Sequence, residues 1–196
     1  MRLIVLSLPS FFSGELACLE ELLSAGLEKL HLRKPGAGEK EMEALLRSLS
    51  PRWSSRLVLH GSQALAEKYG IPQVHLSGKE WRATLPGPLA VSASLHSWEE
   101  LKEAPAFEYV FMSPLFDSIS KPGYPAGKDL LQRPSGGYPC PVIGLGGINK
   151  DNIACMIREG WEGAALLGWI WQEPGKAAER YKELGKIIEK YSDHGK

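Results

Sequence analysis

Eight short apolar runs with strand character recur along this chain, and helical patterns separate most of them. Strands that alternate with helices imply a parallel sheet, because the crossover between two parallel strands needs a segment of about helix length. Eight such units favour a sheet that closes into a barrel. The runs are residues 3–8, 29–33, 56–60, 73–76, 89–94, 109–113, 141–145 and 163–167.

The chain is short for this architecture, because it has 196 residues where typical (β/α)8 barrels have about 250. Two connections, residues 78–88 and 127–138, are too short or too irregular for full helices. The sequence contains no linker and no repeat beyond the alternation of strands and helices. We therefore expect the α/β class and a small (β/α)8 TIM barrel in one domain, residues 1–196. The barrel is expected over about residues 3–189, with a polar tail at 190–196.

Composition argues against a partner bound through bulk charge. The 23 basic and 23 acidic residues cancel, so neither nucleic acid nor a membrane surface is expected as a partner. No segment approaches membrane-spanning length, and residues 1–6 are too short an apolar run for a signal peptide. The three cysteines are widely spaced and form neither a metal pattern nor a disulfide framework. A cytoplasmic protein that handles a small molecule is the expectation.

Two strand-like runs near the C-terminal end of the chain finish at glycine. The run at 141–145 leads to Gly146 and Gly147, and the run at 163–167 leads to Gly168. A glycine lets an anion approach the backbone, whose N–H groups can then donate to it. The loops after the seventh and eighth strands are where many (β/α)8 barrels hold a phosphate. These glycines therefore predict a phosphate site.

The second strand-like run ends with side chains suited to a polar site. Alternation puts His31 and Arg33 on one face, and Leu30 and Leu32 on the other, where they can pack under helices. We expect His31 and Arg33 to point into the barrel mouth. The planar guanidinium of Arg33 suits a phosphate or carboxylate, and no acidic residue ends a neighbouring strand to neutralise it.

The remaining histidines and the long loop after the sixth run carry weaker signals. His60 and His75 also lie at strand ends, yet no His-x-x-x-His pair and no carboxylate cluster accompanies them. Separate polar or catalytic histidines are therefore favoured over a metal site, and His75 reads as a hydrogen-bonded core residue. The loop at 117–127 combines hydroxyls, a lysine and glycines, which fits either a functional lid or an ordinary surface loop.

Seven segments, taken together in their order and spacing, resemble the family of thiamine-phosphate synthase and its relative TenI. They are residues 31–34, 57–60, 74–76, 94–97, 113–121, 144–148 and 163–170, and the likeness covers about residues 3–189. The resemblance implies a (β/α)8 barrel. It implies one of two activities. The synthase joins a pyrimidine pyrophosphate to a thiazole phosphate, releases pyrophosphate and needs Mg²⁺. TenI-like members aromatise a thiazole tautomer by moving a proton without a metal.

The resemblance also implies roles for individual residues. Gly146 and Gly147, with the backbone near Leu167 and Gly168, hold the thiazole phosphate. A second group binds the pyrophosphate, whose developing charge suits cations and hydroxyl donors. This group consists of Arg33, Ser94, Ser118, Ser120 and Lys121.

The chain departs from the family pattern at several of these positions. The synthase has Asn-Asp after its third strand, where this chain has His60 and Gly61. Mg²⁺ prefers oxygen ligands, so only Glu80 stays as a candidate metal ligand, for the synthase reading alone. The lysine expected two residues after Arg33 is Pro35 here, which leaves Lys34 as the candidate cation.

A further departure concerns the proton-transfer residue. The histidine that TenI carries after its sixth strand is replaced by Ser113-Pro114. We expect His31 or His60 to supply the proton-transfer group from a neighbouring strand, with Lys121 as a further catalytic candidate.

Three functions remain open at this point. The leading interpretation is a TenI-like enzyme of thiamine biosynthesis that needs no cofactor. The second is a thiamine-phosphate synthase with altered Mg²⁺ ligation. The third is a non-catalytic barrel that binds thiamine phosphate and regulates the pathway. The expected partner is a phosphorylated thiazole or thiamine phosphate, and a homodimer is possible. Trp169 and Trp171 could pack the bottom of the barrel, line its mouth or form a dimer contact, and the sequence does not distinguish these.

Overall fold

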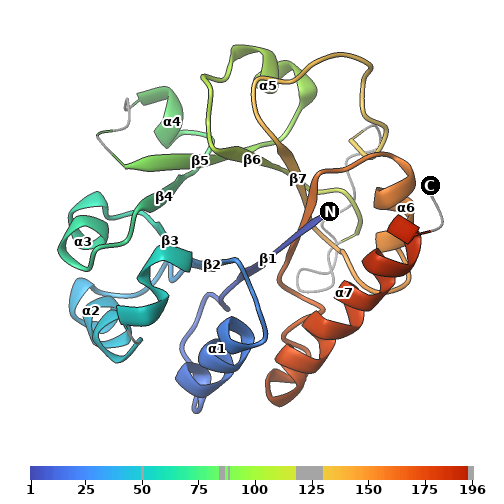
Figure 1. Cartoon of the computed structure of the whole chain (residues 1–196). Coiled ribbons are helices and arrows are strands. Elements are labelled where there is room, and N and C mark those ends of the chain that lie inside the picture. Colours follow the sequence, from blue (N-terminus) through green and yellow to red (C-terminus); the bar gives the residue numbers. More distant parts are fainter. Residues whose placement is uncertain (50, 84–86, 88, 118–129, 194–196) are drawn as a thin grey trace.

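Eight parallel strands close into a barrel, and β8 pairs again with β1. The computed structural model describes residues 1–49, 51–83, 87, 89–117 and 130–193. Figure 1 shows the strands in a ring with the helices outside it, so the expected (β/α)8 barrel is confirmed. The expected runs overlap every strand and differ from it by at most two residues at either end. The strands are β1 Arg2–Leu6, β2 Lys29–Leu32, β3 Leu57–His60, β4 Gln73–Leu76, β5 Ala90–Leu95, β6 Tyr109–Met112, β7 Val142–Leu145 and β8 Gly163–Leu166.

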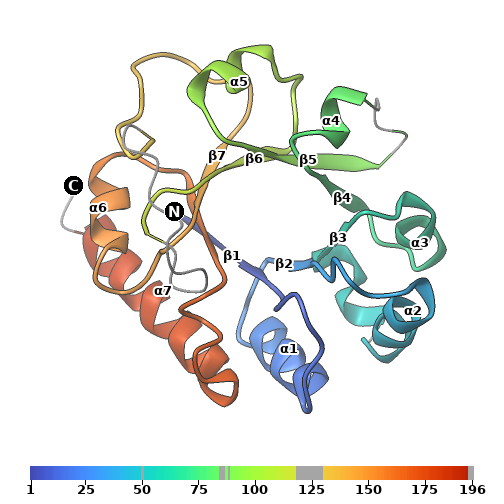
Figure 2. The ribbon, with the colours of Figure 1, turned by 180° about the vertical axis from the view of Figure 1, so that it is seen from behind.

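The helices of the described residues cover the outside of the barrel unevenly. Between β4 and β5 the described residues contain only the single turn α4, and those between β6 and β7 contain no helix. The view from behind in Figure 2 shows the same uneven ring. These are the two connections that were expected to be irregular. The helices are α1 Glu15–Ser24, α2 Glu39–Ser48, α3 Gln63–Lys68, α4 Glu80–Ala83, α5 Trp98–Glu103, α6 Ile153–Arg158 and α7 Ala177–Asp193, with 3-10 turns η1 Pro51–Arg56 and η2 Pro174–Lys176.

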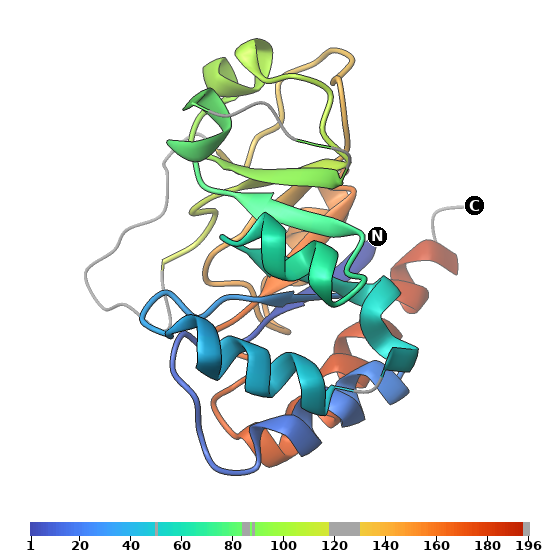
Figure 3. The same ribbon diagram turned by 90° about the vertical axis from the view of Figure 1, so that its left-hand side faces the viewer.

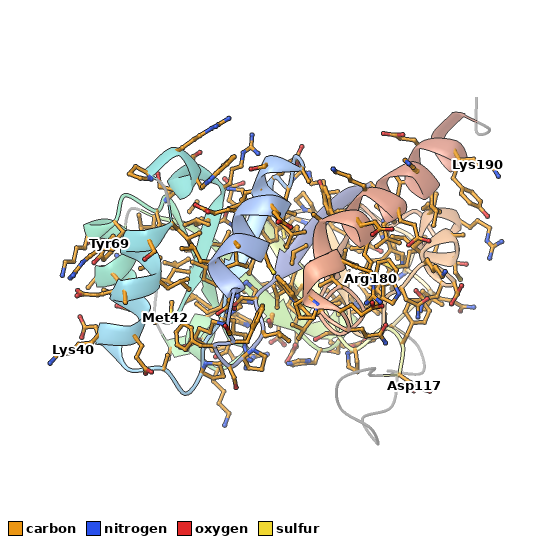
Figure 4. The ribbon with its side chains drawn as sticks, turned by 90° about the horizontal axis from the view of Figure 1, so that it is seen from below. Lys40, Met42, Tyr69, Asp117, Arg180 and Lys190 are labelled. Atoms are coloured by element: carbon orange, nitrogen blue, oxygen red, sulfur yellow. The ribbon has the colours of Figure 1, made fainter. Side chains whose placement is uncertain are left out.

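Local sequence signals explain where several helices begin. The Ser97 hydroxyl accepts a hydrogen bond from the Glu100 backbone N–H at 3.2 Å, as the Ser-x-x-Glu pattern predicts. Because each helix follows a strand of the parallel sheet, the helices start at the end of the barrel where the strands finish. Figure 4 shows Lys40 near the start of α2 and Asp117 after β6 at that same end, which we call the mouth, while Lys190 lies at the opposite end. None of the described helices has the length and apolar character needed to cross a membrane.

Strand alternation divides the apolar residues into two cores. Leu3 and Val5 of β1 join the large core between the strands and the surrounding helices, whereas Ile4 and Leu6 join a smaller core inside the barrel. Figure 3 shows the barrel from the side, with α1, α2 and α7 outside the strands. The inner apolar residues lie on β1, β6, β7 and β8: Ile4, Leu6, Tyr109, Phe111, Ile143 and Ala165.

The other half of the barrel interior is polar. Strands β2 to β5 carry histidine, glutamine and serine at buried positions where β1 and β6 to β8 carry aliphatic and aromatic residues. Burying polar groups costs free energy unless they are hydrogen-bonded, so these side chains must bond one another. The candidate site therefore lies in this polar half of the barrel. The fully buried members are His31, Gln73, His75 and Ser92.

Candidate active site

Three histidines from adjacent strands meet inside the barrel. His31 of β2 and His75 of β4 are buried, and His60 is half-buried at the end of β3. The Nδ1 of His31 lies 3.0 Å from the Nε2 of His60, and the rings of His60 and His75 stack with centroids 4.3 Å apart. His31 thus points inward as alternation predicts. The structure gathers into one cluster the histidines that the sequence presented as separate residues.

Hydroxyl groups hold two of these rings from behind. The Nε2 of His31 lies 2.6 Å from the hydroxyl of Tyr109. The Nδ1 of His75 lies 2.9 Å from Ser92 Oγ, and its Nε2 lies 2.8 Å from Ser94 Oγ. His75 is therefore the hydrogen-bonded interior residue that was expected, and Ser94 lies within the cluster.

Burial keeps the three imidazoles neutral. Loss of solvent lowers the pKa of His31 and of His75 well below the ordinary value, and the neighbouring His60 lowers both further. The pKa of His60 falls to about 3, first through burial and then through the positive charge of Arg33. Burial raises the pKa of Tyr109. At neutral pH the cluster therefore consists of uncharged rings and a protonated phenol that can pass protons along hydrogen bonds.

Arg33 lies at the mouth, close enough to act electrostatically on this cluster. Its side chain is exposed, and its charge lowers the pKa of both His60 and His75. Its backbone N–H donates to Ser7 Oγ at 3.0 Å, which fixes the end of β2 against β1. Within the described part of the chain no carboxylate forms an ion pair with Arg33, so its guanidinium can complement an anionic ligand.

Lys34 does not occupy the place that a substrate cation needs. Its ammonium is buried, pairs with Glu15 of α1, and donates to the carbonyls of Leu8 at 2.8 Å and Ser10 at 3.1 Å. Three acceptors use all three of its N–H bonds. The physical reason is alternation, since a side chain one residue after the inward Arg33 turns outward toward the helix. This corrects the expectation that Lys34 reaches the pyrophosphate.

The loop after β7 has the backbone that a phosphate cradle requires. Gly146 and Gly147 have positive φ angles of 109° and 65°. A Cβ on Gly147 would lie 2.3 Å from the carbonyl oxygen of Asp117, so only glycine fits there. Among the described residues no acceptor takes the N–H of Gly147 or Ile148. Leu167 and Gly168, both half-buried, follow the neighbouring strand β8 at the same end.

The described residues offer no convergent set of the oxygen ligands that Mg²⁺ prefers. Glu80 is exposed on α4, and its carboxylate accepts the N–H of Ser77 at 2.7 Å. Across the described ranges, the one group of three or more His, Cys, Asp or Glu side chains whose ligand atoms converge consists of the histidines of β2, β3 and β4. Nitrogen ligands suit Mg²⁺ poorly. Ser118, Ser120 and Lys121 lie outside the described residues.

Sequence reasoning gave no role to His96, which the structure also places at the mouth. It is exposed just past β5, and its Nδ1 donates to the carbonyl of Ser113 at 2.9 Å. The signal was present in the alternation, because Ser92, Ser94 and His96 fall on one face of the strand.

A cavity of about 260 Å³ opens at the opposite end of the barrel. Arg2, Lys29, Gln73 and Tyr109 are among its lining residues. They lie at or near the N-terminal ends of their strands, and in (β/α)8 barrels that end serves stability while active sites lie at the mouth. The mouth is therefore the candidate site.

Comparison with known proteins agrees with this geometry. The family model described as thiamine monophosphate synthase matches residues 7–170. A thiamine-phosphate synthase of Listeria monocytogenes is 28% identical over 172 residues, which cover 79% of this chain and 80% of that protein.

Solved structures give the same result. The thiamine phosphate pyrophosphorylase of Bacteroides thetaiotaomicron is 31% identical, covers 96% of this chain and 98% of its own, and has a TM-score of 0.78. The thiamine phosphate pyrophosphorylase of Pyrococcus furiosus, 23% identical over 96% of each chain with a TM-score of 0.78, shows the same fold. Because the family model covers more than half of the chain, the protein belongs to the thiamine monophosphate synthase family.

Proposed function

We propose that this member of the family acts in thiamine biosynthesis on a phosphorylated thiazole, which it aromatises by moving a proton. The observation that carries the proposal is the contact between His31 Nδ1 and His60 Nε2 at 3.0 Å, on the mouth side of a hydrogen bond to Tyr109. A chain of neutral rings and a phenol can accept a proton at one end and release another elsewhere.

The glycine loops, Arg33 and the polar half of the barrel have different roles in this proposal. Gly146, Gly147 and the backbone at Leu167 and Gly168 bind the thiazole phosphate. The positive φ angles support this role, as do the N–H groups after β7 that no acceptor among the described residues takes. The guanidinium of Arg33 complements the negative charge of the bound substrate that these N–H groups leave uncompensated. This arrangement holds the thiazole ring over the polar half of the barrel.

Exposure separates the roles of the two histidines. His31 has no exposed surface, so it cannot touch a substrate and serves as a positioning residue that relays a proton. His60, half-buried at the end of β3, is the group that exchanges the proton with the thiazole ring. Lys121, Ser118 and Ser120, which lie outside the described residues, remain candidates for binding the charged groups of the substrate.

Synthase activity is the second candidate, and a specific finding favours it. The relatives from Listeria monocytogenes and Bacteroides thetaiotaomicron are named thiamine-phosphate synthase and thiamine phosphate pyrophosphorylase. Against it stands the absence of a convergent set of oxygen ligands among the described residues. Binding of thiamine phosphate without turnover is the third candidate.

One experiment separates the three. Purified protein is given the thiazole tautomer in EDTA, and separately thiazole phosphate with pyrimidine pyrophosphate in Mg²⁺, with thiamine phosphate followed by its fluorescent oxidation product. We expect aromatisation in EDTA that His60→Asn abolishes and His96→Asn retains. Thiamine phosphate that appears only with Mg²⁺ would establish the synthase instead. Tight binding of thiamine phosphate with neither turnover would leave a binding protein.

A further inference from the structure

The three histidines inside the barrel converge as metal ligands do. One ring nitrogen from each of His31, His60 and His75 lies within 4.8 Å of the other two. They come from three adjacent strands, and His60 and His75 are register partners in neighbouring strands. Strands hold side chains more rigidly than loops do, so this convergence belongs to the framework of the barrel. We propose that His31, His60 and His75 bind a divalent transition-metal ion of the Zn²⁺ class.

The spacing of the ligand atoms fits such an ion. Tetrahedral zinc with Zn–N bonds of about 2.0–2.1 Å separates its ligand nitrogens by about 3.3 Å. The Nδ1 of His31 and the Nε2 of His60 are 3.0 Å apart, which a small rotation of either ring corrects. The ligand nitrogen of His75 lies no more than 4.8 Å from the others, so it has to approach by at most about 1.5 Å. The ring of His75 already stacks on the ring of His60, so the two side chains lie side by side.

Hydrogen bonds on the far side of the rings are compatible with the required tautomers, because a hydroxyl oxygen can accept from a ring N–H. A metal on His31 Nδ1 requires a proton on Nε2, and that nitrogen faces the Tyr109 hydroxyl at 2.6 Å. A metal on His75 Nε2 requires a proton on Nδ1, and that nitrogen faces Ser92 Oγ at 2.9 Å. Ligating histidines usually donate their second N–H to such an acceptor, which fixes the ring and strengthens the ligand. Tyr109 and Ser92 therefore act as the outer shell of the site.

Three imidazoles leave one position of a tetrahedral ion open. His60 is half-buried at the end of β3, where the charge of Arg33 acts on it, so the open position faces the mouth, beside the Ser94 hydroxyl that now bonds His75 Nε2 at 2.8 Å. Three protein ligands with one open position are typical of catalytic rather than structural zinc sites. Imidazole ligands favour Zn²⁺, Co²⁺, Ni²⁺ or Cu²⁺ over the Mg²⁺ that the synthase reading requires.

The inference goes beyond the proposed function and does not depend on it. A bound ion takes the place of the proton shared by His31 and His60, so the metal-bound and proton-relay states exclude each other. Metal binding can therefore be measured in the free protein without any substrate.

The test uses untagged, EDTA-treated full-length protein and Co²⁺ as a spectroscopic probe. We expect one Co²⁺ per chain with the intense visible absorption of a four-coordinate ion, displaced by equimolar Zn²⁺. His60→Asn and His75→Asn are expected to abolish the spectrum. Tyr109→Phe, which removes an outer-shell partner, should weaken Co²⁺ binding about 10–100-fold. His96→Asn is the matched control, because it removes an exposed mouth imidazole outside the cluster, and it should bind as the wild type does.

Several outcomes would overturn the proposal. They are the absence of Co²⁺ uptake by the wild type, the weak spectrum of a six-coordinate ion, or binding that His60→Asn and His75→Asn leave unchanged. Circular dichroism in EDTA checks that each variant is folded. The wild-type spectrum alone reports the coordination geometry of the ion. The proposal can therefore be refuted even if a variant fails to fold.

Discussion

Replacing Gly147 with alanine tests whether the loop after β7 is a shaped cradle or an ordinary turn. Gly147 has φ of +65°, and a Cβ there would lie 2.3 Å from the Asp117 carbonyl oxygen and 2.7 Å from Phe116 Cβ. The third nearest atom is the Phe116 carbonyl carbon at 2.8 Å, so two of the three nearest atoms belong to the backbone. The loop after β6 must therefore move for alanine to fit.

Two costs add at this position. The left-handed backbone costs a non-glycine residue about 1–2 kcal/mol. Forcing extra volume into a packed contact costs about 1–3 kcal/mol more. We therefore expect Gly147→Ala to lower the free energy of unfolding by about 2–5 kcal/mol. Gly70 supplies the matched control, since its φ is +63° and nothing lies within 4 Å of an added Cβ. Gly70→Ala should cost only the backbone component, about 1–2 kcal/mol.

Urea denaturation followed by circular dichroism measures both variants, and calorimetry with inorganic phosphate and with thiazole phosphate measures binding. Gly147→Ala should lose affinity for both ligands, whereas Gly70→Ala should keep the wild-type affinity. Equal destabilisation by the two substitutions would refute the steric argument. Unchanged phosphate affinity in a folded Gly147→Ala variant would remove the β7 loop from the proposed phosphate site.

Three further predictions rest on other parts of the molecule. The half-buried His60 and the buried His75 have pKa values below the ordinary value in the folded chain, so the unfolded chain binds more protons below about pH 6.5. In EDTA, the free energy of unfolding should be constant above that pH and should fall below it by about 1.4 kcal/mol per pH unit for each such histidine. The fall should be less steep in His75→Gln. A urea midpoint that does not change between pH 7 and 5 would contradict this. Lys34→Met leaves the Glu15 carboxylate buried without its partner and should lower the free energy of unfolding by about 3–5 kcal/mol. Adding Glu15→Leu should restore most of this loss. A double variant as unstable as the single one would show that lost packing, not the unpaired charge, causes the destabilisation. Arg33→Gln should change stability by less than about 0.5 kcal/mol yet weaken thiazole phosphate binding about tenfold or more, and calorimetry showing wild-type affinity would exclude Arg33 from the site.

Much of the fold was readable because its signals are local. The alternation of strand-like and helical runs fixed the parallel sheet, and the count of eight favoured closure, which pairing of β1 with β8 confirms. The lack of a full helix among the described residues after β4 and β6 was also readable, because a helix needs a more periodic sequence than they contain. The inward direction of His31 followed from the period of two that every strand obeys.

Lys34 shows where a local rule was available but not applied. The same alternation that turns Arg33 toward the mouth turns Lys34 outward. Its burial depends on Glu15, nineteen positions earlier in the chain, which only the packing of α1 against β2 brings beside it. A sequence pattern gives the direction of a side chain, while the partner that it meets depends on another element.

The sequence alone determined the barrel, the glycine loop after β7 and the inward faces of the strands, because each follows from residues close together along the chain. Only the tertiary structure decided that His31, His60 and His75 form one cluster backed by Tyr109. These residues are separated by 29, 15 and 34 positions, and no spacing rule links them. Their meeting depends on the order and stagger of the strands around the closed barrel, which bring distant residues to the same level inside it.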